Sequence, residues 1–338
     1  MVLKRKLASW LQNEWYGKRT PSPLLRPLEA AFRQAVQLRQ RAYREGRKPV
    51  ERLPVPVIVV GNLTVGGTGK TPLTIWLADF LKSQGYRPGI ISRGYGGSAQ
   101  SQPLAVAPDA DPTQAGDEPV LIARRTGCPV YIFPKRAAAG RALLAATDCG
   151  IIIADDGLQH YALARDIEIA VVDGARGFGN GHCLPAGPLR EPPERLQSVD
   201  LVVYSGMAPE NGFGMTLDGG EAVNLRDETL RRPLGTFAGQ PLRALAGIGN
   251  PARYFEHLRR FGLEFEAREF PDHHRFGPDD LAFAGDLPLL MTEKDAVKCR
   301  ALARPEHWYV PVEARLPVAF GENLSTLLKE ESDGRKTA

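Results

Sequence analysis

The chain has 338 residues, of which 43% are hydrophobic and 24% charged, a composition typical of a globular protein long enough for two domains. The net charge of +4 is unevenly distributed along the chain. Residues 1–50 hold 12 Lys or Arg and three acidic residues, a local charge of +9. The remainder holds 31 of the 43 basic and 36 of the 39 acidic residues, a charge of −5. A basic segment outside the folded body argues against a nucleic-acid-binding protein, whose basic surface lies on the domain itself. The cysteines form no Cys-x2-Cys pair, which predicts reduced thiols in a cytosolic protein without disulfides or structural zinc: Cys128, Cys149, Cys183 and Cys299.

Residues 1–50 contain two amphipathic helical patterns, separated by Pro21 and Pro23. Lys and Arg surround apolar side chains that recur at helical spacing: Leu3, Leu7, Trp10, Leu11 and Trp15, then Leu25, Leu28, Phe32 and Val36. No apolar run approaches the ~20 residues that span a bilayer, and the uninterrupted apolar region of a signal peptide is missing. Such helices lie in an anionic membrane interface or pack their apolar stripe on a domain, and the residues alone leave both possibilities open.

Residues 51–312 alternate short β-rich runs with helical patterns, which predicts parallel sheets with helices on both faces. In the first part, strands are expected at 57–60, 89–92, 130–133, 151–154, 167–172 and 201–204, and helices at 71–84, 118–125 and 136–146. Residues 206–240 are rich in glycine and are expected to be irregular. A second, smaller α/β unit follows, with strands at 242–246, 264–270, 287–291 and 308–312 and helices at 251–261 and from 294; a polar tail begins after Lys329.

The segment GNLTVGGTGKT, residues 61–71, joins the first expected strand to the first helix of the body. Its glycines allow backbone N–H groups to converge on an anion, and the helix N-terminus adds a favourable dipole. The strict P-loop spacing requires a glycine where this chain has Thr64, but the Gly-Gly-x-Gly-Lys-Thr nest is retained. The pattern favours a phosphate-binding loop over a glycine-rich turn with a solvated lysine, and its binding residues are Thr64, Val65, Gly66, Gly67, Thr68, Gly69, Lys70 and Thr71.

The segment GIIIADDGLQH has the pattern of a Walker-B strand, because four apolar residues end at Asp155 and Asp156. Carboxylates at the end of a strand near a P-loop can hold Mg²⁺ together with the hydroxyl of Thr71. The two motifs together predict a P-loop NTPase-like parallel sheet. Gln159 and His160 follow on the same turn and are expected to face the same crevice.

Three other polar clusters are candidates for a site. The loop SRGYGG, residues 92–97, ends a strand and suits a polar substrate. In AGDEPVL, Asp117 and Glu118 begin a helix, and the residues alone favour a capping role for Asp117. In FPDHHRF, His273 and His274 follow a strand of the second unit, where such a pair is solvated unless it faces a cleft.

These motifs, in this order, closely resemble the tetraacyldisaccharide 4′-kinase (lipid A 4′-kinase) family: VVGNLTVGGTGKTP, ISRGYGG, AGDEPVL, DDGLQH, FGNGHCLPAGPLRE, AGIGNP, DHH and MTEKDAVK. The resemblance covers residues 53 to about 312. It implies two α/β/α units with the active site in the cleft between them. It also implies that ATP and Mg²⁺ are used to phosphorylate the 4′-hydroxyl of a lipid disaccharide 1-phosphate, a precursor of lipid A, to form lipid IVA. The implied location is the anionic cytoplasmic face of the inner membrane of a Gram-negative bacterium, with no nucleic-acid or protein partner indicated.

The resemblance also assigns roles to residues. It implies that Asp117 is the catalytic base, which reverses the capping interpretation, and that His273 is its partner in a dyad. The Asp-His order favours His273 over His274. The other implied roles are the P-loop lysine Lys70, the Mg²⁺ ligands Thr71, Asp155 and Asp156, and, on the sugar and 1-phosphate side, Arg93, Tyr95, Arg136, Gln159 and His160.

Three segments are therefore expected: basic membrane-interface helices in 1–50, a P-loop kinase core in 51–205, and a second α/β unit in 206–338 that closes the cleft. The alternative is a membrane-associated P-loop ATPase switch without a lipid-sugar substrate, but that class carries an extra lysine where this chain has Val65. A GTPase lacks support, because TEKDAVK contains no Asn-Lys pair. A non-catalytic membrane-binding module would not consume ATP in response to a lipid disaccharide.

Overall fold

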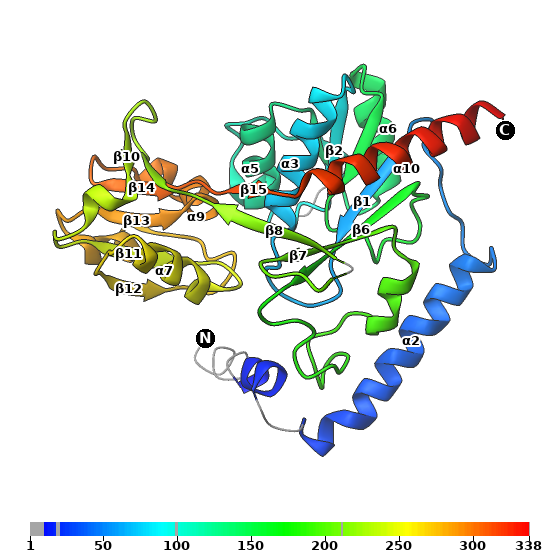
Figure 1. Ribbon diagram of the computed structural model, residues 1–338, viewed down its shortest axis with the longest axis horizontal. Coiled ribbons are helices and arrows are strands. Elements are labelled where there is room, and N and C mark those ends of the chain that lie inside the picture. The colour runs from blue at the N-terminus through cyan, green and yellow to red at the C-terminus, as the bar shows by residue number, and fades with distance from the viewer. Residues whose placement is uncertain (1–9, 18–20, 99–100, 211, 338) are drawn as a thin grey trace.

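The computed structural model describes residues 10–17, 21–98, 101–210 and 212–337, which form two α/β units side by side (Figure 1). The larger unit is built on a nine-stranded sheet and the smaller unit on a six-stranded sheet. Most neighbouring strands are parallel in both sheets. The expected α/β class is confirmed.

The larger sheet has the strand order β15-β8-β7-β6-β1-β5-β2-β4-β3. Its strands are β1 (Val57–Gly61), β2 (Pro88–Ser92), β3 (Leu104–Ala105), β4 (Val130–Ile132), β5 (Ile151–Ala154), β6 (Ile167–Asp173), β7 (Leu201–Ser205), β8 (Phe213–Asp218) and β15 (Glu313–Arg315). β1 lies between β5 and β6, and every one of its residues is buried because helices cover both faces of the sheet. The carboxyl ends of β1, β2 and β5 therefore meet at one edge, where a ligand site of an open α/β sheet is expected.

Helices cover both faces of the larger sheet (Figure 1). They are α3 (Lys70–Ser83), α4 (Pro112–Ala115), α5 (Asp117–Thr126), α6 (Arg136–Ala146), η2 (Pro193–Ser198) and α10 (Val318–Thr337). The apolar side chains of α3, α5 and α10 enter the core on one face, and those of α6 enter the core on the other. In α3, Leu73, Leu77 and Leu81 recur every four residues, so the helix buries one stripe against the sheet.

The smaller sheet has the order β10-β9-β14-β13-β11-β12. Its strands are β9 (Glu221–Asn224), β10 (Arg231–Pro233), β11 (Arg243–Ala246), β12 (Glu266–Glu269), β13 (Leu289–Thr292) and β14 (His307–Val310). Its helices are η3 (Leu234–Phe237), α7 (Pro251–Arg260), α8 (Pro278–Leu281), η4 (Ala282–Ala284), α9 (Glu293–Cys299) and η5 (Arg300–Leu302). α7 packs with Trp308 on one face, and α8 and α9 pack with Met291 on the other.

The boundary between the units differs from the expected division at residue 206. β8 and β15 pair with each other in the larger sheet, and α10 packs Phe320 and Leu324 into the core of that sheet. The smaller unit is therefore inserted between β8 and β15 and does not extend to the end of the chain. The chain enters the smaller unit from β8 and returns from it into β15, the two neighbouring strands at this end of the larger sheet.

One local expectation also differs from the structure. Residues 206–240, expected to be irregular, contain the short strands β8, β9 and β10, and Gly219 and Gly220 link β8 of the larger sheet to β9 of the smaller sheet. The polar tail after Lys329, for which the sequence predicted no secondary structure, continues α10 as far as Thr337, since the helix is already anchored by its buried apolar residues.

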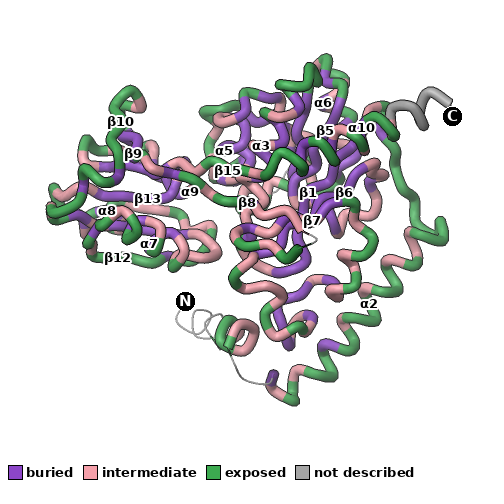
Figure 2. Tube along the Cα trace, viewed as in Figure 1, coloured by how far each residue is buried: buried purple, intermediate pink, exposed green. Residues whose placement is uncertain are grey.

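The N-terminal segment lies along the outside of the larger unit (Figure 1), and most of it is exposed (Figure 2). It contains η1 (Pro23–Leu25) and α2 (Arg26–Arg44). On α2, Phe32 packs against the core of the larger unit, whereas Leu28 and Leu38 are 57% and 54% exposed. α2 thus attaches to the body through part of its apolar stripe and leaves other leucines uncovered.

A separate helix at residues 10–16 is attached through Trp15, whose Nε1 donates to the carbonyl oxygen of Pro185 at 2.9 Å. Leu3 and Leu7 of the expected first helix lie outside the described residues. In the described part of the chain, no helix combines the length and apolar character that crossing a bilayer requires.

Candidate active site

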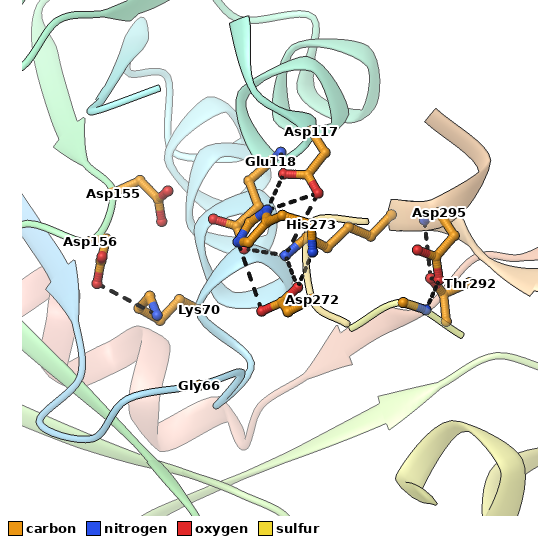
Figure 3. A network of polar contacts seen from close by, with 12 residues as sticks. Gly66, Lys70, Asp117, Glu118, Asp155, Asp156, Asp272, His273, Thr292 and Asp295 are labelled. Carbon is orange, nitrogen blue, oxygen red and sulfur yellow. Dashed lines mark hydrogen bonds and ion pairs between the residues drawn. The ribbon is translucent and has the colours of Figure 1, made fainter. Parts of the chain in front are cut away.

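The glycine-rich loop lies at the carboxyl edge of the larger sheet, between β1 and α3 (Figure 3). Gly66 and Gly69 have φ angles of 106° and 99°, which glycine adopts without strain. A Cβ on Gly69 would lie 2.9 Å from Cε of Met215 and 3.0 Å from Oγ of Ser205, so a side chain here would also displace neighbouring atoms. α3 begins at Lys70, with Thr71 in its first turn, and its N-terminus follows the loop directly. The loop thus has the strand–loop–helix geometry of a phosphate-binding loop.

Lys70 is held by two side chains near the loop. Its Nζ lies 3.5 Å from Oδ1 of Asp156 and donates to Oδ1 of Asn62 at 3.4 Å. Arg190 Nη1 donates to both carboxylate oxygens of Asp156, at 3.2 and 3.3 Å. Burial raises the pKa of Asp156, but the charges of Lys70 and Arg190 outweigh burial and lower the pKa to about 2. Asp156 therefore stays ionised, in a left-handed backbone conformation with φ 47°.

Asp155 follows β5 and is only 1% exposed. Its carboxylate accepts hydrogen bonds from Oγ1 of Thr74 at 3.2 Å and from Oγ of Ser92 at 3.4 Å. Burial, and then the negative charges of Glu118 and Asp156, raise the pKa of Asp155 to about 7. A carboxyl group in this environment gains most when a cation is placed beside it.

The residues at this edge fit a nucleotide with Mg²⁺. Oγ1 of Thr68 is buried and has no hydrogen-bond partner within the described ranges, so the loop holds a free donor for a phosphate oxygen. Asp155, Asp156 and the hydroxyl of Thr71 are oxygen ligands of the kind that Mg²⁺ prefers. No group of three or more His, Cys, Asp or Glu side chains suited to a metal occurs among the residues described, which accords with Mg²⁺ taking only one or two protein carboxylates beside substrate phosphates.

Asp117 and His273 belong to different units and meet in the same region as the P-loop (Figure 3). His273 Nδ1 donates to Oδ1 of Asp117 at 2.9 Å and lies 3.0 Å from Oδ2. Asp117 is the first residue of α5 and is 3% exposed, and Gly116 occupies the N-cap position. His274 instead hydrogen-bonds Asp280 of its own unit at 2.9 Å. Of the two adjacent histidines, His273 is the one that reaches Asp117.

The two members of this pair have opposite pKa shifts. Burial raises the pKa of Asp117, but the hydrogen bond from His273 and the charges of Lys294 and Lys298 lower it to about 2. Burial is the largest influence on the pKa of His273 and lowers it, but the hydrogen bond to Asp117 and the negative charges of Asp117 and Asp272 together leave the pKa above the ordinary value. A carboxylate of such low pKa is a weak base by itself, so the basicity of the pair resides mainly on the imidazole.

Arg136 contacts Asp156, and Arg93 and His160 lie near Arg136. Arg136 is 4% exposed; its Nη2 donates to the carbonyl oxygen of Asp156 at 3.2 Å, and its buried Nε has no partner among the residues described. Burial lowers the pKa of Arg136 to about 10. Burial, followed by the charges of Arg136, Arg165 and others including Arg93, lowers the pKa of His160 to about 4. A neutral histidine in a positive field suits an anionic ligand.

Gln159 and Tyr95 have different surroundings. Gln159 Nε2 donates to the carbonyl oxygen of Asn62 at 3.1 Å and lies 3.4 Å from Oε2 of Glu191, so it braces the segment that enters the P-loop. Tyr95 is 64% exposed on the loop after β2, and its ring meets the edge of the His273 ring with centroids 5.0 Å apart. The structure thus places Tyr95 beside the dyad and Gln159 beside the loop.

Several residues contact this site but received no individual role from the sequence: Asn62, Arg190, Lys294 and Lys298. Arg190 belongs to the segment FGNGHCLPAGPLRE and the two lysines to MTEKDAVK, and the family resemblance rests on these segments as whole motifs. One sequence signal could have pointed to the two lysines: they are four residues apart in an expected helix, so they lie on the same face of it.

A buried strand that ends in a glycine loop at a helix N-terminus, beside a strand that ends in two aspartates, defines the P-loop nucleotide-binding enzymes. Comparison with known proteins narrows this class. The chain belongs to the tetraacyldisaccharide-1-P 4′-kinase (LpxK) family, whose model matches residues 21–329. It is therefore a kinase, and the resemblance seen in the sequence is confirmed.

Individual relatives can be aligned with this chain over most of their own length. A protein of Nitrosococcus oceani named tetraacyldisaccharide 4′-kinase is 55% identical over 323 residues, which cover 96% of this chain and 95% of the relative. A protein of the same name from Pseudomonas paraeruginosa is 52% identical over 309 residues, 90% of this chain and 93% of the relative. The crystal structure of LpxK from Aquifex aeolicus in complex with ATP aligns with a TM-score of 0.73 and 27% identity, over 89% of this chain and 97% of that one.

Proposed function

We propose that this kinase transfers the γ-phosphate of ATP to the 4′-hydroxyl of a tetraacyldisaccharide 1-phosphate and so forms lipid IVA in lipid A biosynthesis. The family, the names of the relatives and the ATP in the Aquifex aeolicus structure support this assignment. The observation that carries it is the contact between Asp117 and His273, which supplies a base where the two units meet near the P-loop.

On the ATP side, the loop from Thr64 to Thr71 binds phosphate oxygens through its backbone N–H groups and hydroxyls, and Lys70 neutralises charge on the β- and γ-phosphates. Thr71, Asp155 and Asp156 are the residues that would hold Mg²⁺, which when bound supplies further positive charge to the phosphate oxygens. Arg190 keeps Asp156 ionised for this role.

On the acceptor side, the Asp117–His273 pair accepts the proton of the attacking sugar hydroxyl. Because Nδ1 donates to Asp117, the neutral imidazole keeps a lone pair on Nε2, and the carboxylate stabilises the imidazolium that forms. Asp117 acts together with His273 and not as an independent base, because a carboxyl with a pKa of about 2 holds a proton poorly. Since His273 comes from the smaller unit, seating that unit against the larger one assembles the pair.

The sugar and the 1-phosphate are assigned to Tyr95 beside the dyad and to three residues near Asp156: Arg93, Arg136 and His160. Arg93 and Arg136 supply positive charge for the 1-phosphate around a neutral His160. The exposed ring of Tyr95 offers an apolar face to the sugar beside His273. Gln159 acts on the ATP side through its hydrogen bond to Asn62.

The acceptor is a lipid, so the enzyme must work at a membrane. We assign this role to the N-terminal helices, where Leu28 and Leu38 of α2 are exposed among arginines. Such a surface binds anionic bilayers by interfacial burial and charge attraction. The expected location is the cytoplasmic face of the inner membrane in a Gram-negative bacterium, without a protein or nucleic-acid partner.

The test measures ATP consumption and acceptor phosphorylation together, in mixed micelles with and without the tetraacyldisaccharide 1-phosphate. A kinase consumes ATP in step with product and shows little turnover when the acceptor is omitted. A membrane-associated ATPase switch would instead turn over ATP with anionic vesicles alone. Acceptor-independent turnover at the full rate would therefore overturn the proposal.

Replacing either dyad member tests the base. Asp117→Ala and His273→Ala should each lower kcat by ~10²–10⁴-fold, the usual contribution of general-base catalysis. The reason is that Asp117 and His273 accept the proton of the acceptor hydroxyl and do not bind the nucleotide. ATP affinity, measured by calorimetry, should remain close to that of the unchanged enzyme. Simultaneous loss of ATP binding and thermal stability in Asp117→Ala would make Asp117 a structural residue and remove it from the mechanism.

A further inference from the structure

The smaller unit presents α9 to the dyad. The helix follows β13 directly, and Thr292 caps it by accepting a hydrogen bond from the backbone N–H of Asp295 at 3.1 Å. Lys294 and Lys298 are four residues apart, so they project from the same face of α9. Both ammonium groups lie near the Asp117 carboxylate, which belongs to the larger unit.

Lys294 connects the two sides of the dyad. Its side chain is 15% exposed, and Nζ lies 2.8 Å from Oε1 of Glu118 and 3.1 Å from Oδ1 of Asp272. Glu118 follows Asp117 on α5, and Asp272 precedes His273 on the loop of the smaller unit. One ammonium group thus binds the immediate chain neighbours of both dyad residues, and it lies 4.0 Å from Oδ2 of Asp117 itself.

Lys298 is fixed within its own unit. Its side chain is 8% exposed, and Nζ lies 2.8 Å from Oδ1 of the fully buried Asp295 and 5.0 Å from the centre of the Phe276 ring. The other oxygen of Asp295 accepts hydrogen bonds from the backbone N–H of Gly247 at 2.9 Å and from Oγ1 of Thr292. From this fixed position, Lys298 lies 3.8 Å from Oδ2 of Asp117.

We infer that Lys294 is a positioning residue for phosphoryl transfer: its ammonium group ties Asp272 to Glu118 and thereby aims Nδ1 of His273 at Asp117. The inference rests on the proposed function, in which this pair accepts the proton. His273 has φ 59°, a left-handed conformation that a non-glycine residue keeps only when its surroundings impose it. The ion pair of Asp272 with Lys294 and the hydrogen bond of His273 to Asp117 impose it from two sides.

The charge of Lys294 gives this role a signature that packing alone would not have. Asp117 faces His273, Lys294 and Lys298, whereas His273 faces Asp117, Asp272, Lys294 and the ring of Tyr95. Removing one positive charge favours protonation of the pair, so its pKa rises. If the unprotonated pair is the active form, the acid limb of the kcat–pH profile moves to higher pH.

The experiment compares Lys294→Met with Lys294→Arg and with the matched control Arg125→Met. Arg125 Nη1 lies 2.7 Å from Oε2 of Glu293, so this ion pair joins the same two helices, α5 and α9, without contacting the dyad. Lys294→Met should lower kcat roughly tenfold to hundredfold, the cost of a misplaced catalytic group, with the KM for ATP within about twofold. Its acid limb should move to higher pH. Lys294→Arg should restore most of kcat, and Arg125→Met should leave both kcat and the limb unchanged.

A second measurement does not depend on turnover. The ring signals of His273, identified by their loss in His273→Gln, are followed by NMR as the pH is varied. In Lys294→Met the titration midpoint should move to higher pH, and in Arg125→Met it should not. Lys294→Gln, which introduces a polar side chain of similar length, is included in both measurements. If Lys294→Met does not fold, this variant still tests the inference.

Two results would overturn the inference. The first is a wild-type kcat and pH profile in both Lys294→Met and Lys294→Gln. The second is an equal loss of kcat in Lys294→Met and Arg125→Met, with no shift of the acid limb or of the His273 signals. The second result would mean that contact between α5 and α9 matters and the ammonium group does not. Failure of the proposed function is distinguishable, because the unchanged enzyme would then consume ATP at the full rate without the acceptor. Failure of the dyad alone would instead leave Asp117→Ala and His273→Ala phosphorylating the acceptor at the normal rate.

Discussion

At the P-loop, different residues determine the fold and the chemistry. The backbone of the loop depends on Gly66 and Gly69, which adopt positive φ angles. The ammonium group of Lys70, in contrast, has polar contacts with Asn62 and Asp156, at the edge where phosphate would bind. Function and folding can therefore be separated by a single substitution at Lys70.

We expect Lys70→Ala to lower kcat by roughly 10²–10³-fold, the usual cost of removing one preorganised charge from a transition state. The far-UV circular dichroism and the unfolding temperature should stay close to those of the unchanged protein. The measurement is acceptor phosphorylation by the folded variant under saturating ATP. A near-normal rate would count decisively against a phosphate role for this loop.

The hydrogen bond between His273 and Asp117 makes stability depend on pH with a defined sign. The pKa of His273 is raised in the folded protein, so the bond adds stability that is fully present below the unfolded pKa of 6.5 and is lost as the pH rises through the higher folded value. His273→Gln should therefore lower the unfolding temperature more at pH ~6 than at pH ~9. Differential scanning calorimetry across this range measures the difference.

His160 provides the control of opposite sign. Its pKa is lowered to about 4, so the unfolded chain binds the extra proton and the folded protein loses stability as the pH falls below about 6.5. His160→Gln has no histidine to protonate at this position, so its unfolding temperature should rise relative to that of the unchanged protein as the pH is lowered. Parallel pH trends in the two glutamine variants would show that the shifts do not arise from these side chains.

At the scale of elements, the sequence predicted what local patterns determine. β1, β5 and α3 lie within one or two residues of the expected ranges, because continuous apolar runs and the spacing of Leu73, Leu77 and Leu81 are strong signals. β8, β9 and β10 were missed because they are short and interrupted by glycines, and local pattern cannot show that β8 pairs with β7 and β15.

The residues of the candidate site, too, could be predicted only where a local sequence pattern marks them. The P-loop and the Asp155–Asp156 pair could be predicted because each follows a buried strand. The meeting of Asp117 with His273 was expected only through the family resemblance. Lys294 lies 176 residues from its partner Glu118, and only the packing of α9 against α5 brings them together. Contacts between units depend on the whole fold and leave no local pattern in the sequence.

The exposed leucines of α2 predict how the enzyme binds a membrane. Replacing Leu28 and Leu38 together by Gln should weaken binding to anionic vesicles, because each leucine loses part of the ~1.5–3 kcal/mol gained by burying such a side chain. The electrostatic part, ~1 kcal/mol for each nearby Lys or Arg, should fade in 1 M salt, where screening acts within ~3 Å. Vesicle co-sedimentation at low and high salt measures both contributions.

Phe32 on the same helix is the matched control. It packs against the core of the larger unit, so Phe32→Gln should lower the unfolding temperature more than the double leucine variant does. Unchanged vesicle binding in the leucine variant would assign these exposed side chains no membrane role.

At the scale of the whole molecule, the P-loop helix α3 shares one core with α5 and α10, so a ligand at the loop should stabilise the larger unit as a whole. ATP with Mg²⁺ at 100 times its Kd should add about 2.7 kcal/mol to the free energy of unfolding. The corresponding rise in unfolding temperature should be much smaller for Lys70→Ala, which loses contacts to the phosphates. A rise that is equal in both proteins would place the nucleotide elsewhere.

The insertion of the smaller unit between β8 and β15 also determines the order in which a ribosome delivers the parts. Translation completes the smaller unit, from β9 to β14, while the larger unit still lacks β15 and α10. Until then nothing occupies the place of Phe320, whose ring meets that of Trp76 on α3 with centroids 5.4 Å apart. A nascent chain released at residue 312 would carry every residue assigned to catalysis and still expose the apolar side of its nucleotide-binding helix. For this enzyme, the segment synthesised after the smaller unit is the one that completes the core of the larger unit.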